Sequence, residues 1–137
     1  MSKSAAFQLI NYMFTKIDID FESQQTKKVN IDFKPSGVFN SETSEYDLKF
    51  NFTVVDTEKD DKQFINITCI GTFKIDDVKS KENIPPFFYI NSIAILFPYL
   101  RAFISTITLQ ANIPVLVLPT YNLSELEPVL RDNTTVK

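Results

Sequence analysis

Apolar and polar residues alternate along the N-terminal third of the chain, which predicts half-buried β-strands. The pattern is mixed over residues 7–14 and regular over residues 17–22, where isoleucine or phenylalanine alternates with aspartate or glutamate. A second alternating run begins at Val29 and meets a Pro-Ser-Gly sequence at residues 35–37. Because proline lacks an amide hydrogen, we expect this strand to bend or cross there and residues 36–45 to form the first sizeable loop.

Two further alternating runs, residues 46–54 and 65–75, flank a charged cluster over residues 58–62. The cluster is more typical of a solvated hairpin tip than of a metal site, because two adjacent aspartates do not make a coordination shell. Each run places its apolar residues on one face and its polar residues on the other. The pattern therefore predicts an antiparallel sheet with one solvated face.

The hydrophobic period changes in the C-terminal half of the chain. Leu96, Leu100 and Ile104 recur at helical spacing and predict a helix from Pro98 to Gln110, with Pro98 in its first turn. The β-branched residues over 104–108 would also suit a strand. The periodicity alone therefore leaves helix and strand both open.

The segment after this helix is apolar and bracketed by prolines over residues 113–119. Proline cannot pair as part of a central strand, so we expect an extended loop laid over apolar surface. Asn122 or Ser124 is expected to cap a short last helix, with Glu125 and Glu127 in its first turn, where the helix dipole favours negative charge.

Charge is distributed very unevenly. The chain has 14 lysine and arginine and 17 aspartate and glutamate residues, yet only Arg101 lies within residues 83–124. A run this long without charge is typical of a subunit interface or of a surface that accepts apolar partners. Prolines and polar residues within the run favour buried protein over a membrane span. Arg101 itself is expected to make a structural ion pair or to bind backbone carbonyls.

Composition excludes several classes of function. The absence of histidine excludes imidazole base catalysis, a Ser-His-Asp triad and a histidine-ligated metal. Two glycines are too few for a Walker loop or a dinucleotide-binding fingerprint, so no cofactor is expected. A net charge of -3 provides no general attraction to nucleic acid or to anionic lipid.

The ends and the length of the chain suggest a single cytoplasmic domain. Residues 1–137 fit one domain that is large enough to fold without disulfides. The apolar part of the N-terminus is interrupted by Gln8 and Asn11, unlike the core of a secretory signal peptide. Cys69 is the only cysteine and lies in an alternating run. A small buried hydrophobe is the simplest interpretation, and a reactive thiol is the alternative.

Three segments of the chain match, in order, the pattern of one known family. They are FQLINYMFTKIDIDFE at residues 7–22, YDLKFNFTVV through FINITCIGTFKI at residues 46–75, and LFPYLRAFISTITLQANIPVLVLPTYNLSELE at residues 96–127. The last segment contains an FPY-x-R sequence and a proline-bracketed apolar loop. Together they resemble the SecB-like protein-export chaperones over nearly the whole chain.

The resemblance implies an α+β fold with a four-stranded antiparallel sheet and two helices packed on one side. It further implies a homotetramer, a dimer of dimers whose long helices lie between eight-stranded sheets. It decides in favour of a helix over residues 98–110 and implies that this helix lies at the tetramer interface. The expected interface residues are Phe103, Ser105, Thr106, Ile107 and Thr108.

The resemblance also implies a function, the binding of unfolded polypeptides without ATP in long apolar grooves. Such a site is a surface for an extended chain, so no catalytic residue and no enzyme activity are expected. For Phe33 and Phe97 a purely structural role in the core is an equal alternative. The residues expected to line the groove are Phe33, Pro35, Phe97, Tyr99, Leu100, Val115, Leu116 and Leu118.

The family docks to the secretory ATPase through an acidic patch, and this chain matches the patch only in part. Asp18, Asp20 and Glu22 resemble its first-strand portion, but a further acid of the family corresponds to Ile67, and the family's long C-terminal tail is not matched after residue 137. Docking to the secretory ATPase is therefore in doubt, and these acids can equally be a solvated face.

Three functions follow from these patterns. The first is a general ATP-independent holdase for nonnative polypeptides, as in protein export. The second is a dedicated SecB-like chaperone of an antitoxin in a toxin-antitoxin system, which the incomplete docking patch favours. The third is a small-ligand-binding or enzymatic domain that uses carboxylates such as Asp18 and Asp20, whose expected exposure argues against it.

Overall fold

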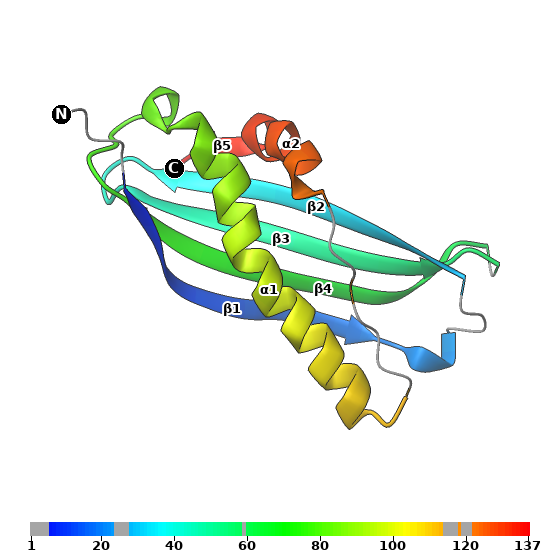
Figure 1. Ribbon diagram of the computed structural model, residues 1–137. Helices are drawn as coiled ribbons and strands as arrows, with labels where there is room; N and C mark the ends of the chain where they lie inside the picture. Colours follow the sequence, from blue (N-terminus) through cyan, green and yellow to red (C-terminus); the bar gives the residue numbers. More distant parts are fainter. Residues whose placement is uncertain (1–5, 24–27, 59, 114–117, 119–121) are drawn as a thin grey trace.

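The computed structural model describes residues 6–23, 28–58, 60–113, 118 and 122–137. These residues form a five-stranded sheet in the order β1-β4-β3-β2-β5, together with two α-helices (Figure 1). Short 3-10 turns lie at Phe21–Ser23, Lys81–Asn83 and Leu123–Leu126. The main elements are β1 (Phe7–Ile19), β2 (Val29–Asn40), β3 (Glu45–Asp56), β4 (Lys62–Ile75), α1 (Pro86–Gln110), α2 (Glu127–Asp132) and β5 (Thr134–Val136).

The four long strands pair antiparallel, as the alternating pattern predicts, but the expectation of a four-stranded sheet was wrong. β5 adds a fifth strand that runs parallel to β2, opposite Gly37–Phe39. A strand of three residues is too short to show a period in the sequence. The position of β5 depends on its pairing with β2, a strand that lies far away along the chain.

The loop expected over residues 36–45 was also wrong, because β2 continues through its Pro-Ser-Gly sequence to Asn40. β2 pairs with β3 without interruption from Val29 opposite Asp56 to Asn40 opposite Glu45. Proline is tolerated at residue 35 because β5 covers the other side of β2 only from Gly37 onward. At Pro35 this side of β2 is therefore a sheet edge, where the missing amide hydrogen leaves no carbonyl of a neighbouring strand without a partner.

Two irregularities explain why the sequence pattern of β1 is mixed. The register against β4 shifts between Leu9 and Asn11 and again between Phe14 and Lys16. Each shift inserts one residue, so the side chains that face the helix layer do not keep a strict period of two. They are Phe7, Leu9, Tyr12, Phe14, Ile17 and Ile19.

Helix α1 begins at Pro86, twelve residues before the expected start, and Pro98 lies in its interior rather than in its first turn. Pro86 fits the first turn because its missing amide hydrogen would have no partner there. Apolar residues occur on all sides of α1 before residue 97, which hides the helical period. The buried side is nevertheless a continuous stripe of Phe88, Tyr89, Ser92, Ile93, Leu96, Phe97, Leu100, Ile104 and Thr108.

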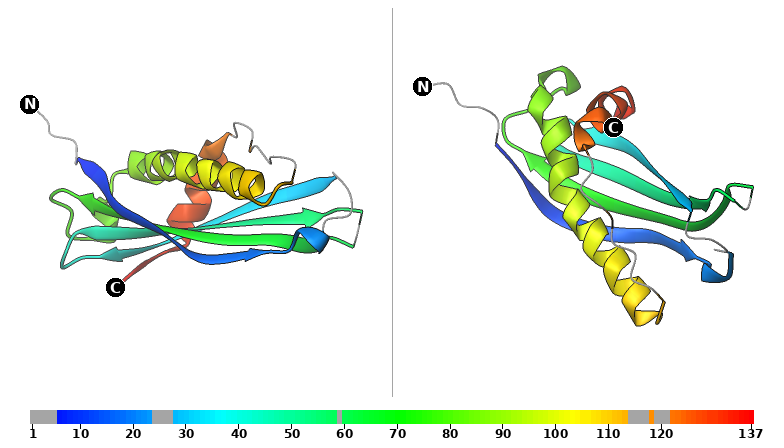
Figure 2. Two further views of the ribbon diagram at one scale, coloured as in Figure 1. Left: turned by 90° about the horizontal axis from the view of Figure 1, so that it is seen from below. Right: turned by 45° about the vertical axis from the view of Figure 1, so that its right-hand side comes forward.

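Helix α1 crosses one face of the sheet, and the hydrophobic core lies between them. The edge-on view in Figure 2 shows α1 on one side of the long strands. Fully buried side chains from the middle strands, among them Tyr46, Leu48, Phe50 and Phe73, form the sheet side of this core. Helix α2 packs beside α1 and contacts β2.

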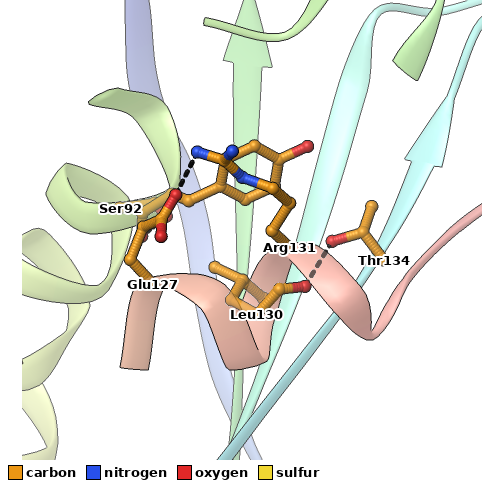
Figure 3. A network of polar contacts seen from close by, with 6 residues as sticks. Ser92, Glu127, Leu130, Arg131 and Thr134 are labelled. Atoms are coloured by element: carbon orange, nitrogen blue, oxygen red, sulfur yellow. Dashed lines mark hydrogen bonds and ion pairs between the residues drawn. The ribbon is translucent and has the colours of Figure 1, made fainter. Parts of the chain in front are cut away.

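A polar network attaches the C-terminal elements to the sheet. The Tyr46 hydroxyl and Thr134 Oγ1 lie 2.6 Å apart, and Thr134 Oγ1 donates to the Leu130 carbonyl at 2.7 Å. Arg131 pairs with Glu127 one helical turn away (Figure 3). Burial raises the pKa of Tyr46 above its ordinary value. The network fixes the position of β5, which pattern alone does not predict.

Cys69 is fully buried and packs with the core, in agreement with the simplest interpretation of the sequence. Burial raises the pKa of its thiol to about 11. We therefore expect slow alkylation of native protein by iodoacetamide at pH 8 and rapid alkylation in urea, measured by intact mass. Because burial raises the folded-state pKa, the contribution of Cys69 to stability is complete below the ordinary thiol pKa of about 9 and is lost as the pH rises toward 11. Rapid alkylation without urea would contradict this burial.

Candidate functional site

An aromatic cluster forms where β2 approaches α1. The Phe33 ring centroid lies 5.5 Å from that of Phe50 and 5.5 Å from that of Phe52. Phe97 of α1 contacts Phe33 edge to face at 5.8 Å. The structure thus brings together two of the expected groove residues that are far apart in the sequence. Pro35, two residues along β2, is buried opposite Phe50.

A hollow of about 380 Å³ extends along α1 from this cluster. Phe97, Pro98, Arg101, Ala102 and Ser105 line it, and their spacing places them on two adjacent rows of the helix. Phe97 is only 6 % exposed, so it forms the apolar wall of the hollow while also serving the core. Arg101 is exposed and makes no ion pair among the described residues, unlike the structural pair expected from the sequence.

The other expected groove residues are not part of this cluster. Tyr99 is 40 % exposed and lies against Tyr12 of β1, with ring centroids 4.3 Å apart, on the opposite side of α1 from Phe97. Leu100 and Leu118 are fully buried in the core. Val115 and Leu116 lie outside the described residues. Tyr99 therefore belongs to a second surface, shared by α1 and β1.

This second surface is apolar and stays exposed among the residues that the structure describes. The sequence predicted the α1 part of this surface as an uncharged interaction region. It did not predict the β1 part, because the two register shifts of β1 obscure the alternating pattern there. Exposed large apolar residues of α1 and of the helix-facing side of β1 form it, namely Phe87, Ile95, Tyr99, Leu109, Tyr12 and Ile17.

The side chains expected at a tetramer interface differ in their positions. Thr106 is exposed, and Ser105 and Ile107 are half-buried. Phe103 stacks on Phe14 of β1 with ring centroids 4.2 Å apart. Thr108 is buried, and its hydroxyl donates to the Ile104 carbonyl at 2.9 Å within the helix. Within this set, Thr106 is the side chain most open to a second subunit.

The acidic residues near the end of β1 do not form one strand face. β1 ends at Ile19, so only Asp18 of the three is in the strand. Asp20 accepts a hydrogen bond from the Glu22 amide at 3.1 Å in the turn that follows. Ile67 is buried on the helix side of β4, whereas the outward neighbour of Asp18 is Asn66, an amide. The expectation of a strand extending to Glu22 was therefore wrong.

Other kinds of site have little support within the described ranges. No group of three or more cysteine, aspartate or glutamate side chains gathers there in a geometry suited to a metal ion. α1 is long and apolar enough to cross a membrane by length and composition alone. Its buried stripe nevertheless packs on the sheet in the manner of a core helix.

Comparisons with known proteins agree with this architecture. The family model described as preprotein translocase subunit SecB matches residues 6–126. The chain is 40% identical over 75 residues to an uncharacterized protein, MJ0357, of Methanocaldococcus jannaschii, covering 52% of this chain and 48% of that relative, about half its length. The fold is similar to the Mycobacterium tuberculosis SecB-like chaperone Rv1957, solved with a peptide of the antitoxin HigA1, with a TM-score of 0.68 and 14% identity over 84% of this chain and 90% of that chain. The chain belongs to the SecB family.

Proposed function

We propose that this protein is a cytoplasmic, ATP-independent holdase that binds nonnative polypeptides through apolar surface beside α1. The hollow along α1 carries the proposal, because Phe97 forms its apolar wall and also contacts Phe33 of the aromatic cluster on β2. Extended chains can place apolar side chains in such a hollow with little dependence on their sequence. The protein would act by binding alone, without catalysis or a cofactor, and without insertion of α1 into a membrane.

We further infer that the apolar surface of α1 and β1 is covered by other copies of the chain in a homotetramer. Several large apolar side chains there, including Ile95 and Leu109, are exposed in the single chain. Monomeric proteins rarely leave so many grouped together. Support also comes from the resemblance to the SecB-like chaperones, which implies assembly as a dimer of dimers. Ala102 of the hollow lies about two helical turns from both Ile95 and Leu109, so the hollow would adjoin this interface directly.

The holdase is tested by light scattering from an aggregation-prone protein as it refolds. We expect stoichiometric amounts of this chain to suppress scattering severalfold with no nucleotide present, because the client's apolar segments are held in solution. An equal mass of serum albumin serves as the protein control. Unchanged scattering would refute a general holdase.

The position of the client site is tested by Ala102→Glu, which places a carboxylate in the hollow. We expect suppression of scattering to fall about fivefold or more, because an apolar client segment would have to desolvate the charge. Gln63→Glu adds the same charge at an exposed position of β4 and should leave suppression unchanged. Native mass is measured in parallel. A loss of suppression together with a loss of native mass would place Ala102 in the assembly interface and contradict this site.

A dedicated antitoxin chaperone is the second candidate. The similarity to a SecB-like chaperone solved with an antitoxin peptide favours it. The interrupted acidic patch at the end of β1 also favours it, since a dedicated chaperone has no need of the secretory ATPase. Binding of the purified protein to that ATPase, measured by calorimetry, separates the candidates. Micromolar binding would favour the general export role.

A further inference from the structure

The sheet face opposite α1 carries a hollow of about 430 Å³ that is framed by lysines. Lys16 of β1, Lys34 of β2 and Lys49 of β3 line it, so the three strands each contribute one positive charge. Val129 and Asn133, at the C-terminal end of α2, also line the hollow. α1 lies on the other side of these strands (Figure 2), so the lysine hollow is separate from the apolar hollow along α1.

The strand register explains why these lysines meet. Lys16 lies opposite Thr68, Thr68 opposite Asn51, and Asn51 opposite Lys34. These four residues form one row across β1, β4, β3 and β2, with a lysine at each end. Lys49 lies two residues from Asn51 along β3 and therefore points to the same face. The row spans three strand spacings, or roughly 14 Å.

The floor of the lysine hollow offers oriented hydrogen-bonding groups. Asn51 Nδ2 donates to Asn66 Oδ1 at 2.9 Å and to Thr68 Oγ1 at 3.0 Å, which fixes the amide. Because the Thr68 hydroxyl accepts that bond, its own hydrogen can be donated to a bound group. Carboxylate oxygens accept hydrogen bonds from hydroxyl and ammonium groups and form the stronger, charge-assisted bonds with lysine.

The local charge is positive although the chain as a whole is negative. No aspartate or glutamate is among the described residues that line the hollow. Lys34 lies 3.9 Å from Asp32, at the limit of an ion pair, and Lys16 and Lys49 form no ion pair within the described part of the chain. Three neighbouring ammonium groups, only one of which has a carboxylate within 4 Å among the described residues, attract an anionic partner.

We propose that this lysine hollow docks a short acidic segment of a partner polypeptide. An extended segment advances about 3.4 Å per residue, so about four residues span the lysine row. Carboxylates within the segment would pair with the lysines while its backbone lies over the polar floor. The site is independent of the proposed client site, because it lies on the opposite face of the sheet.

The surrounding charges favour an acidic peptide over nucleic acid. Asp18 and Asp32 lie in the next cross-strand row on one side of the lysines, and Asp47 lies beyond Lys49 on the other. A continuous phosphate backbone extending past the hollow would meet these carboxylates, whereas a short peptide would not. The described lining residues include no aromatic ring on which a base could stack.

The test is fluorescence anisotropy of a labelled peptide with four consecutive glutamates, titrated with the full chain in about 50 mM salt, conditions that favour exposed ion pairs. We expect the triple variant Lys16→Gln, Lys34→Gln and Lys49→Gln to weaken binding about tenfold or more. The control triple variant Lys62→Gln, Lys79→Gln and Lys137→Gln has the same net charge and should bind within about twofold of the unchanged chain. A matching glutamine peptide should not bind.

Equal loss of affinity in both triple variants would overturn the proposal, because it would show attraction to net charge alone. Oligothymidine binding as tightly as the peptide, and lost in the same lysine variant, would also overturn it in favour of nucleic acid. The lysine variant should suppress client scattering as well as the unchanged chain does. A chain that suppresses no scattering but binds the acidic peptide would refute the holdase and leave this docking site standing.

Discussion

Gly37→Ala is expected to lower the free energy of unfolding by about 4 kcal/mol, through overpacking and the loss of a buried hydrogen bond. A Cβ atom at residue 37 would lie 1.9 Å from the Tyr46 hydroxyl oxygen and 2.3 Å from the ring carbon that bears it. Tyr46 is fully buried against Phe88, so its ring has little space to move. Any movement would break its contact with Thr134, which attaches β5.

The measurement is urea unfolding followed by far-UV circular dichroism at one fixed protein concentration, since assembly would make stability depend on concentration. Gly71→Ala is the matched control. Its Cβ atom would meet Leu96 Cδ1 at 3.0 Å and Leu9 Cδ1 at 3.2 Å, the ends of flexible side chains. We expect this control to cost about 1 kcal/mol. Equal losses of unfolding free energy in the two variants would show that the packing of Tyr46 does not require the space beside Gly37.

The double variant Ile95→Asp and Leu109→Asp is expected to abolish the proposed tetramer. Both side chains are exposed in the single chain, so the fold should tolerate the change. In an assembly they would become buried, unpaired carboxylates, each costing roughly 3 kcal/mol or more. Native mass spectrometry should show a fall from four copies of the 15.8 kDa chain to two or one.

The control for this variant is Gln63→Asp with Asn83→Asp, which adds the same charge at exposed positions outside α1. The control should keep the native mass of the unchanged chain. Circular dichroism of both variants shows whether the fold is retained. A double α1 variant that stays folded and keeps its native mass would exclude this surface from the interface.

Strand prediction was accurate where the period of two was regular and the strand was long. β3 and β4 follow the expected runs, and their apolar residues face α1. The period failed in β1, because two register shifts change which residues face inward. It also failed at the start of α1, where Phe87 and Ile90 are exposed and Phe88 and Tyr89 are buried. Hydrophobic periodicity identifies a helix by the contrast between its apolar side and its polar side, and the first part of α1 has few polar residues.

The candidate site was predicted in part. The resemblance pointed to Phe33 and Phe97, and the structure brings them into contact. It also pointed to Tyr99, which instead packs against Tyr12 of β1 on the other side of α1. Neighbouring residues in a helix point in different directions, so closeness in sequence to Phe97 does not place Tyr99 in the same groove. The lysine hollow was missed because its members come from three strands and meet only through the register.

The sequence by itself determined the long strands, the uncharged region, the excluded chemistries and the family, because these depend on local period, composition and ordered motifs. Only the tertiary structure decided how far β2 continues past Pro35, where β5 pairs, and which faces of α1 remain uncovered. Each of these depends on the space and hydrogen-bonding partners that distant segments provide. Tyr46 illustrates the difference, because its alternating position predicts burial, whereas its contact with Thr134 requires the absent side chain of Gly37.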